Sequence, residues 1–232
     1  MLRLKNIHKT FDIGSINEKA ALCDINLQLA EGDFVTVIGS NGAGKSTMLN
    51  AIAGVWPIDE GSISINGTDV TTLPEYKRAQ YIGRVFQNPM MGTVASMGIE
   101  ENLALALRRG DRRTLRWYIT KTEREHYYTE LEKLGLGLEE RLTDKVGLLS
   151  GGQRQALTLL MATLKKPKLL LLDEHAAALD PATAATVLNL TNNIVSENKL
   201  TTLMVTHNMT EAIRHGNRLL MMNAGKIILD IS

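Results

Sequence analysis

The chain has 232 residues, 44% of them hydrophobic, which is enough to bury the core of one large α/β domain. Its 26 Lys plus Arg residues balance 25 Asp plus Glu residues, and this balance excludes the broad positive field that general nucleic-acid binding requires. The single cysteine excludes an internal disulfide. The sequence has no signal-peptide pattern and no run near 18 apolar residues, so we expect any membrane role to depend on partners.

Short apolar runs alternate with helical patterns along most of the chain. The runs have the length of buried strands and lie at residues 34–38, 169–172, 202–205, 218–222 and 226–231. Helical patterns cover residues 45–53, 151–164 and 181–197, and the last of them opens with Pro181 directly after Asp180, as expected for a first helical turn. This alternation predicts an α/β fold with a parallel sheet covered on both faces.

The middle of the chain has a different character. From about residue 87 to 164 helical periodicity dominates, so we predict a helical part inserted into a single domain of residues 1–232, with the core at about 1–86 and 165–232. Within it, residues 111–134 are strongly charged and carry apolar residues at Leu115, Tyr118, Ile119 and Leu131. An amphipathic helix with a solvated face is favoured there over a nucleic-acid surface.

A glycine-rich segment follows the first buried run and opens a helix. It reads Gly39-Ser40-Asn41-Gly42-Ala43-Gly44-Lys45-Ser46-Thr47. Its glycines allow backbone N–H groups to converge on a triphosphate, helped by the positive end of the following helix. In this pattern Lys45 is expected to reach the β- and γ-phosphates and Ser46 to ligate Mg²⁺. The segment therefore predicts a phosphate-binding loop for ATP.

Two carboxylates follow the run at 169–172, namely Asp173 and Glu174. They are expected at the carboxyl edge of a buried strand, where open α/β sheets bind ligands. Asp173 can hold Mg²⁺, and Glu174 can orient or deprotonate the attacking water. Alone, such a pair could be a boundary between a strand and a loop; together with the phosphate loop it predicts nucleotide hydrolysis.

The segment Leu149-Ser150-Gly151-Gly152-Gln153 decides which class of nucleotide hydrolase this is. Alone it could be an ordinary helix start with Ser150 as the N-cap residue. The five-residue string is rare by chance, and with it the sequence resembles the ABC ATPase family, whose signature it is. The resemblance implies a P-loop NTPase (RecA-like) parallel-sheet core with an N-terminal antiparallel β part and an inserted helical subdomain.

Further residues match the family's motifs in the family's order. Phe11 corresponds to the aromatic residue that stacks on adenine, Gln87 to the Q-loop glutamine that contacts the metal, and Asp180 to the D-loop. His207 corresponds to the switch histidine that contacts the γ-phosphate. Alone, these residues could be a core aromatic, a strand-end polar residue, a helix cap and a loop histidine.

The family also implies an assembly, because its members close two cassettes head to tail around ATP. This predicts a homodimer in the ATP-bound state with two composite sites. One chain would supply the phosphate loop together with Gln87, Asp173, Glu174 and His207. The other chain would supply the signature residues Ser150, Gly151, Gly152 and Gln153.

The sequence departs from the family in two places. His175 and Ala176 follow the acidic pair where the family usually has Pro-Thr, and we assign His175 no catalytic part, its role being open. The helix after the signature is unusually apolar at residues 156–160, which predicts that it packs inward.

The single cassette without a long coiled-coil insertion favours the motor of a membrane transporter over a soluble ABC ATPase acting on nucleic acid or ribosomes. A kinase or GTPase is opposed by the signature and by the absence of an Asn-Lys-x-Asp motif. Residues 142–185 look most like ATPase components of bacterial uptake systems, with an exporter ATPase as the alternative. This resemblance implies permease subunits, an extracytoplasmic solute-binding protein, a place at the cytoplasmic face of the cell membrane, and amino-acid cargo. Met90, Met91 and Met97, which follow Gln87, would suit a docking groove for the permease.

Overall fold

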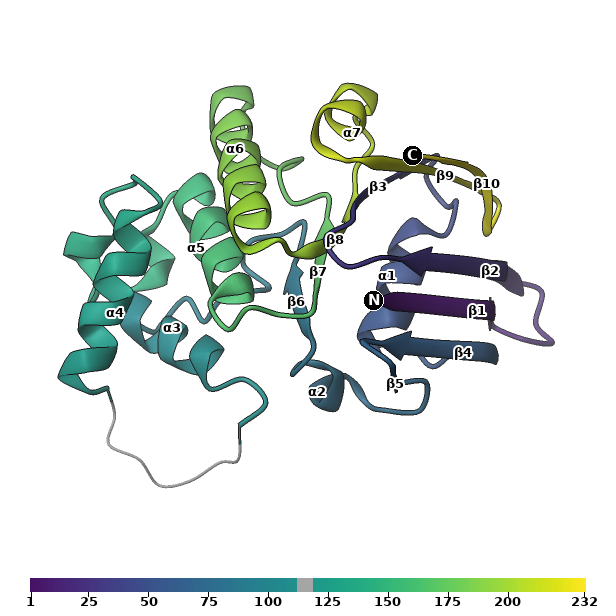
Figure 1. Ribbon diagram of the computed structural model, residues 1–232, viewed down its shortest axis with the longest axis horizontal. Helices are drawn as coiled ribbons and strands as arrows, with labels where there is room; N and C mark the ends of the chain where they lie inside the picture. The colour runs from purple at the N-terminus through teal and green to yellow at the C-terminus, as the bar shows by residue number, and fades with distance from the viewer. Residues whose placement is uncertain (112–118) are drawn as a thin grey trace.

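The computed structural model describes residues 1–111 and 119–232, with two sheets beside a group of helices (Figure 1). The smaller sheet is antiparallel and has the strand order β2-β1-β4-β5. Its strands are β1 (Leu2–Phe11), β2 (Lys19–Leu29), β4 (Glu60–Ile65) and β5 (Thr68–Asp69). Burial alternates along much of β1 and β2, as expected for a sheet with one covered face. The predicted N-terminal antiparallel part is confirmed.

The larger sheet has six strands in the order β10-β9-β3-β8-β7-β6. They are β3 (Phe34–Gly39), β6 (Ile82–Val85), β7 (Leu169–Asp173), β8 (Thr201–Val205), β9 (Arg218–Asn223) and β10 (Lys226–Ile231). All neighbouring pairs except β9 and β10 are parallel. The central strands β3, β7 and β8 are buried along nearly their whole length. The predicted parallel sheet is therefore confirmed.

Two features of this sheet differ from the sequence prediction. Strand β6 was not predicted because Gly83 and Arg84 interrupt its apolar run; Gly83 is needed there because a Cβ would collide with the carbonyl of Ala162. Strand β10 runs antiparallel because the chain turns back through Ala224 and Gly225, with φ of 46° and 77°. Two consecutive positive φ angles are typical of two-residue hairpin turns.

Helices pack against both sheets (Figure 1). The helices that follow β6 and precede β7 along the chain form a separate group. That group has its own apolar core, which includes Tyr127, Leu131 and Leu157. The predicted inward packing of the helix after the signature is confirmed, since Ala156 and Leu159 are also fully buried. The helices are α1 (Lys45–Ala53), α2 (Glu75–Arg78), α3 (Ile99–Leu107), α4 (Lys121–Glu132), α5 (Gly151–Thr163), α6 (Pro181–Asn198) and α7 (Met209–His215), with 3₁₀ turns at Glu139–Arg141 and Val146–Leu148.

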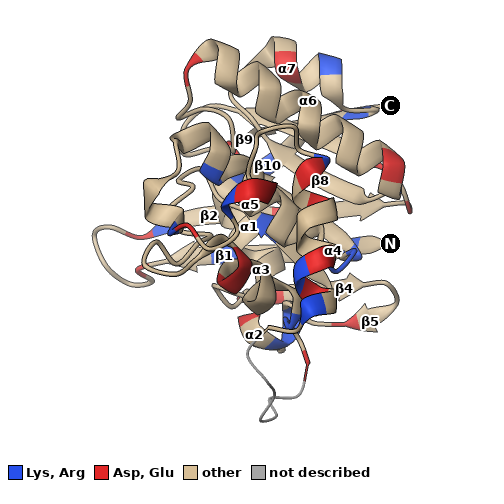
Figure 2. Ribbon diagram, turned by 90° about the vertical axis from the view of Figure 1, so that its left-hand side faces the viewer, with Lys and Arg blue, Asp and Glu red and all other residues tan. Residues whose placement is uncertain are grey.

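The amphipathic helix expected over residues 111–134 is shorter than predicted. Helix α4 begins at Lys121, because Thr120 caps it: the backbone N–H of Glu123 donates to the Thr120 hydroxyl at 3.2 Å, and the Glu123 carboxylate accepts from the Thr120 N–H at 2.8 Å. Leu115 and Tyr118 lie outside the described residues. Helix α4 carries both acidic and basic residues (Figure 2), so it does not present a charge of one sign.

A buried arginine fixes the end of the helix that follows the phosphate loop. Arg78 is 2% exposed, and its guanidinium donates to the carbonyls of Ala51 and Ile52 at 2.8 and 2.9 Å. It also donates to the carbonyls of Leu73 and Thr71 at 2.8 and 2.9 Å. The last carbonyls of a helix have no partner within the helix and carry its negative end, so a buried cation stabilises them. Arg78 thereby anchors α1 against the chain that leads to α2.

We predict that Arg78→Met lowers the free energy of unfolding by about 2 to 4 kcal/mol, because four carbonyls lose the guanidinium donor, although that of Ala51 also accepts from the Gly54 N–H. Urea denaturation followed by circular dichroism measures this change. The matched control is Lys77→Met, which removes the same charge from the neighbouring exposed position and should change stability by less than about 0.5 kcal/mol. Equal stability of the two variants would contradict the capping role.

Candidate active site

The phosphate-loop residues connect β3 to α1 and border a pocket of about 350 Å³. Gly42 and Gly44 have φ of 80° and 99°, and a Cβ at Gly44 would lie only 2.5 Å from the carbonyl oxygen of Ala21. Glycine is therefore required for the loop to pass so close to β2. The pocket is lined by Phe11, Lys19, Ala21, Asn41, Gly42, Ala43, Gly44, Lys45, Ser46, Thr47 and Glu174. Gly39 and Ser40 belong to the same loop but do not line the pocket.

Lys45 is a buried cation at the floor of this loop. Its side chain is 6% exposed, and its ammonium donates to the carbonyls of Gly39 and Ser40 at 2.8 and 3.1 Å. Among the described residues no carboxylate forms an ion pair with it, so the positive charge is only partly compensated. A buried ammonium beside converging backbone N–H groups is a binding site for an anion such as phosphate.

The acidic pair lies at the carboxyl end of β7, next to the phosphate loop. The Ser46 hydroxyl is 3.4 Å from Asp173 Oδ1. Burial raises the pKa of Asp173, and the Arg84 guanidinium, 3.8 Å away, acts in the opposite direction. Glu174 has a φ of 46°, a left-handed conformation that is costly for a residue with a side chain. Its N–H donates to the carbonyl of Val205 at 3.0 Å, which ties it to β8.

Two side chains from other segments converge on the Glu174 carboxylate. Gln87, which follows β6, donates from Nε2 to Glu174 Oε2 at 3.1 Å. His207, which follows β8, has Nδ1 3.5 Å from the same oxygen and a side chain that is 60% exposed. The carboxyl ends of three parallel strands thus bring one carboxylate and two polar groups together. Such a group can orient a water molecule and accept a proton from it.

Phe11 ends β1 and, like Glu174, lines the pocket. Its ring packs edge-on against Trp56, with ring centroids 4.9 Å apart and an interplanar angle of 81°. The ammonium of Lys9 lies 5.5 Å from the Phe11 centroid and is itself paired with Asp59 at 2.8 Å. Trp56 and Lys9 therefore hold the Phe11 ring beside the phosphate loop, a contact that the sequence did not predict.

The signature residues Ser150, Gly151, Gly152 and Gln153 do not join this group and do not line the pocket. Ser150 caps α5: its hydroxyl accepts from the Gln153 N–H at 3.3 Å, and the Gln153 side chain accepts from the Ser150 N–H at 3.2 Å. Asp180 caps α6 in the same way, accepting from the Thr183 N–H at 3.1 Å. Within one chain, Ser150 and Asp180 therefore act as helix caps, which is the role that the sequence allowed for each of them without the family resemblance.

His175, whose role the sequence left open, is a packing residue. It is 2% exposed, and its Nε2 lies 2.9 Å from the hydroxyl of Thr191 on α6. Burial lowers the pKa of His175 to about 4, so the ring is neutral near pH 7. It does not line the pocket, and it holds the turn after the acidic pair against α6.

Arg84 is a component of the site that the sequence did not identify. Its guanidinium donates to Asn50 Oδ1 on α1 at 2.6 Å, lies 3.8 Å from Asp173 and stacks over the Phe86 ring at 4.5 Å. It connects the phosphate-loop helix to the acidic pair. An arginine inside a short apolar run was the only available signal.

A larger groove lies on the other side of Arg84, between α2, α3 and α5. Its volume is about 1170 Å³, and its walls include Arg84, Phe86 and Asn102. Several apolar side chains on it are strongly exposed, namely Tyr76, Met91, Val94 and Leu105. Of the three methionines predicted to form a docking groove, only Met91 lines it; Met90 and Met97 do not, and Met161 of α5 does.

Comparison with known proteins places this chain in a family. The pattern that defines the family described as "ABC transporter" matches residues 22–177. The chain is 46% identical over 233 residues to the tyrosine transport ATP-binding protein of Clostridioides difficile, covering 100% of this chain and 92% of that protein. It is 35% identical over 236 residues to the phosphonates import ATP-binding protein of Treponema denticola, covering 99% and 89%.

A solved structure extends the likeness to three dimensions. A dimeric ATP-binding cassette in a post-hydrolysis state, bound to ADP and Pi, superposes with a TM-score of 0.84 at 30% identity, covering 99% of this chain and 97% of that one. The fold described above agrees with this match. The chain therefore belongs to the ABC transporter family and is an ATPase of that family.

Proposed function

We propose that this ATPase drives the import of a small solute, with an amino acid as cargo, at the cytoplasmic face of a cell membrane. The proposal rests above all on the likeness to a tyrosine transport protein, which extends over the whole chain. Among the described residues no helix has the length and apolar character needed to cross a membrane. Permease subunits would form the path for the solute, and an extracytoplasmic binding protein would deliver it.

Nucleotide binding follows from the walls of the pocket. The loop N–H groups and Lys45 bind the β- and γ-phosphates, and the Phe11 ring offers an apolar face to adenine. The oxygen donors of Ser46 and Asp173, 3.4 Å apart, fit Mg²⁺, a hard cation that takes one or two protein ligands besides phosphates. Gln87, whose amide nitrogen donates to the neighbouring Glu174, would add its amide oxygen. Bound there, Mg²⁺ would neutralise phosphate charge.

Hydrolysis requires a base beside the terminal phosphate, and Glu174 is that base. Its carboxylate takes the proton of the attacking water, while Gln87 and His207, which both approach Glu174 Oε2, fix its orientation. The His207 side chain is 60% exposed, so its ring can turn towards the γ-phosphate. The charge that develops on that phosphate is stabilised by Lys45.

The pocket of one chain lacks the signature, so we propose that a second copy supplies it. The start of α5 presents the Ser150 hydroxyl and backbone N–H groups that lie outside their own chain's pocket. A helix start of this kind binds an anion well. Two copies arranged head to tail would each place this helix start on the γ-phosphate held by the other.

This arrangement predicts the behaviour of two variants. Glu174→Gln keeps the shape and the hydrogen bond to Gln87 but removes the base, so turnover should fall by roughly 10² to 10⁴ while ATP still binds. The stalled protein should elute as a dimer in ATP and as a monomer in ADP on size-exclusion chromatography.

The second variant separates the two chains' contributions. Adding Ser150→Arg to Glu174→Gln puts a bulky side chain where the partner's γ-phosphate would lie, so the ATP dimer should be lost although the chain's own phosphate loop is unchanged. A double variant that still forms a dimer in ATP would show that the signature does not act across the interface. Normal turnover in the single variant would show that Glu174 is not the base.

The groove beside Arg84 is the surface we propose for the permease. It is concave and combines exposed apolar side chains with buried polar groups such as Asn102. These features suit an inserted helix of the membrane subunit, which would lay its apolar face on Met91 and Leu105. Arg84 lines the groove and lies 3.8 Å from Asp173, so an occupant in contact with Arg84 would lie one side chain away from the active site.

We predict that Met91→Glu together with Leu105→Glu weakens co-purification of the protein with detergent-solubilised membranes of its host by roughly tenfold or more, because docking would bury two unpaired charges. ATP binding in solution, measured by calorimetry, should persist. The matched control is Met209→Glu, at an exposed methionine of α7 that is 47% exposed and outside the groove. Undiminished co-purification of the double variant would place the docking surface elsewhere.

A further inference from the structure

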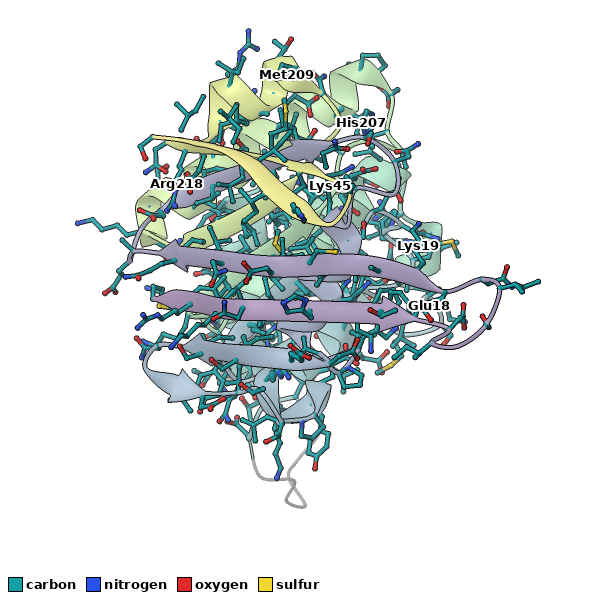
Figure 3. All side chains as sticks on the ribbon, turned by 90° about the vertical axis from the view of Figure 1, so that its right-hand side faces the viewer. Glu18, Lys19, Lys45, His207, Met209 and Arg218 are labelled. Atoms are coloured by element: carbon teal, nitrogen blue, oxygen red, sulfur yellow. The ribbon has the colours of Figure 1, made fainter. Side chains whose placement is uncertain are left out.

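Lys19 reaches into the nucleotide pocket from the small sheet. It is the first residue of β2, and its Cα pairs with that of Phe11, the last residue of β1. Both residues line the pocket. The ammonium of Lys19 lies against the phosphate loop, since a Cβ built on Gly42 would be 3.6 Å from Nζ. Figure 3 labels Lys19, Lys45 and His207 on the same side of the molecule.

No acidic residue in the described part of the chain holds the Lys19 ammonium. The preceding residue, Glu18, uses its carboxylate to accept from the backbone N–H of Gly14 at 2.7 Å. Lys9, on the neighbouring strand β1, differs in this respect, because its ammonium is paired with the Asp59 carboxylate at 2.8 Å. Lys19 thus brings an uncompensated positive charge to a loop that already presents backbone N–H groups. An anion placed between them would be attracted by both.

The position of Lys19 indicates which part of a nucleotide it meets. In the proposed site, Phe11 contacts the base, and Lys45, with the first turn of α1, binds the terminal phosphates. Lys19 stands next to Phe11 in the strand pair and over Gly42 in the loop, between these two ends. The part of ATP that lies between its base and its terminal phosphates is the ribose with the α- and β-phosphates, of which only the phosphates carry charge.

We propose that Lys19 is a second lysine of the nucleotide site and binds the α- and β-phosphates. This inference rests on the nucleotide site proposed above. ATP and ADP share these two phosphates, so Lys19 strengthens the binding of both nucleotides equally. It is remote from the charge that develops at the γ-phosphate during hydrolysis, so it acts on KM and not on kcat.

The test replaces Lys19 by Met, which keeps the length of the side chain and removes its charge. Calorimetric Kd values for ATP and ADP should both rise by roughly 5- to 20-fold, as expected for the loss of one charge-assisted contact to phosphate. KM should rise by a similar factor, with kcat within about twofold of the wild type. Lys19→Arg should keep most of the affinity, and the melting temperature without nucleotide should not change, because the side chain is exposed.

The matched control is Lys5→Met, at an exposed lysine of β1 outside the pocket, which should leave both Kd values unchanged. Three results would overturn the inference: nucleotide affinities of Lys19→Met equal to those of the wild type, a loss for ATP without a loss for ADP, or a fall in kcat at constant KM. Absence of ADP binding to the wild-type protein would instead reject the nucleotide site itself.

Discussion

Parallel pairing of β3, β7 and β8 is the constraint on which the rest of the site depends. Because these strands run in the same direction, their carboxyl ends meet at one edge and release the phosphate loop, the acidic pair and His207 side by side. The Glu174 N–H donates to the carbonyl of Val205, so the end of β7 is held in register with the end of β8. A shift in this pairing would separate Glu174 from the phosphate loop.

The charges at this edge complement those of a metal nucleotide. Lys45 is buried with only carbonyl partners, while Asp173 is partly buried and has a raised pKa, an effect that Arg84 partly offsets. A phosphate chain beside Lys45 and a divalent cation beside Asp173 would each relieve an unfavourable burial. Arg78 stabilises this arrangement, because it anchors the C-terminal end of α1, the helix whose first turn carries Lys45.

Local patterns predicted the parts of the fold that depend on neighbouring residues. Helix α1 was predicted with its observed bounds because the phosphate loop and the helical pattern lie in one continuous segment. Contacts between distant segments could not be predicted. Gly83 of β6 lies against the backbone of Ala162, and Arg84 approaches Asp173 only after the sheet has formed. Lys19 likewise has no motif, and only the pairing of β1 with β2 directs it towards Gly42.

One helix connects the groove with the signature. The carboxyl-terminal half of α5 contributes Thr158 and Met161 to the groove, and its first turn follows Ser150. Gln155, between them, donates to the carbonyl of Phe86 at 3.1 Å, next to Gln87. A helix rises by about 1.5 Å per residue, so Thr158 and Ser150 are roughly 12 Å apart along one rigid rod. A displacement of this groove wall would therefore move Ser150 with it, and under the proposed roles of the groove and of the signature, occupancy of the groove would be coupled to closure on the partner's nucleotide.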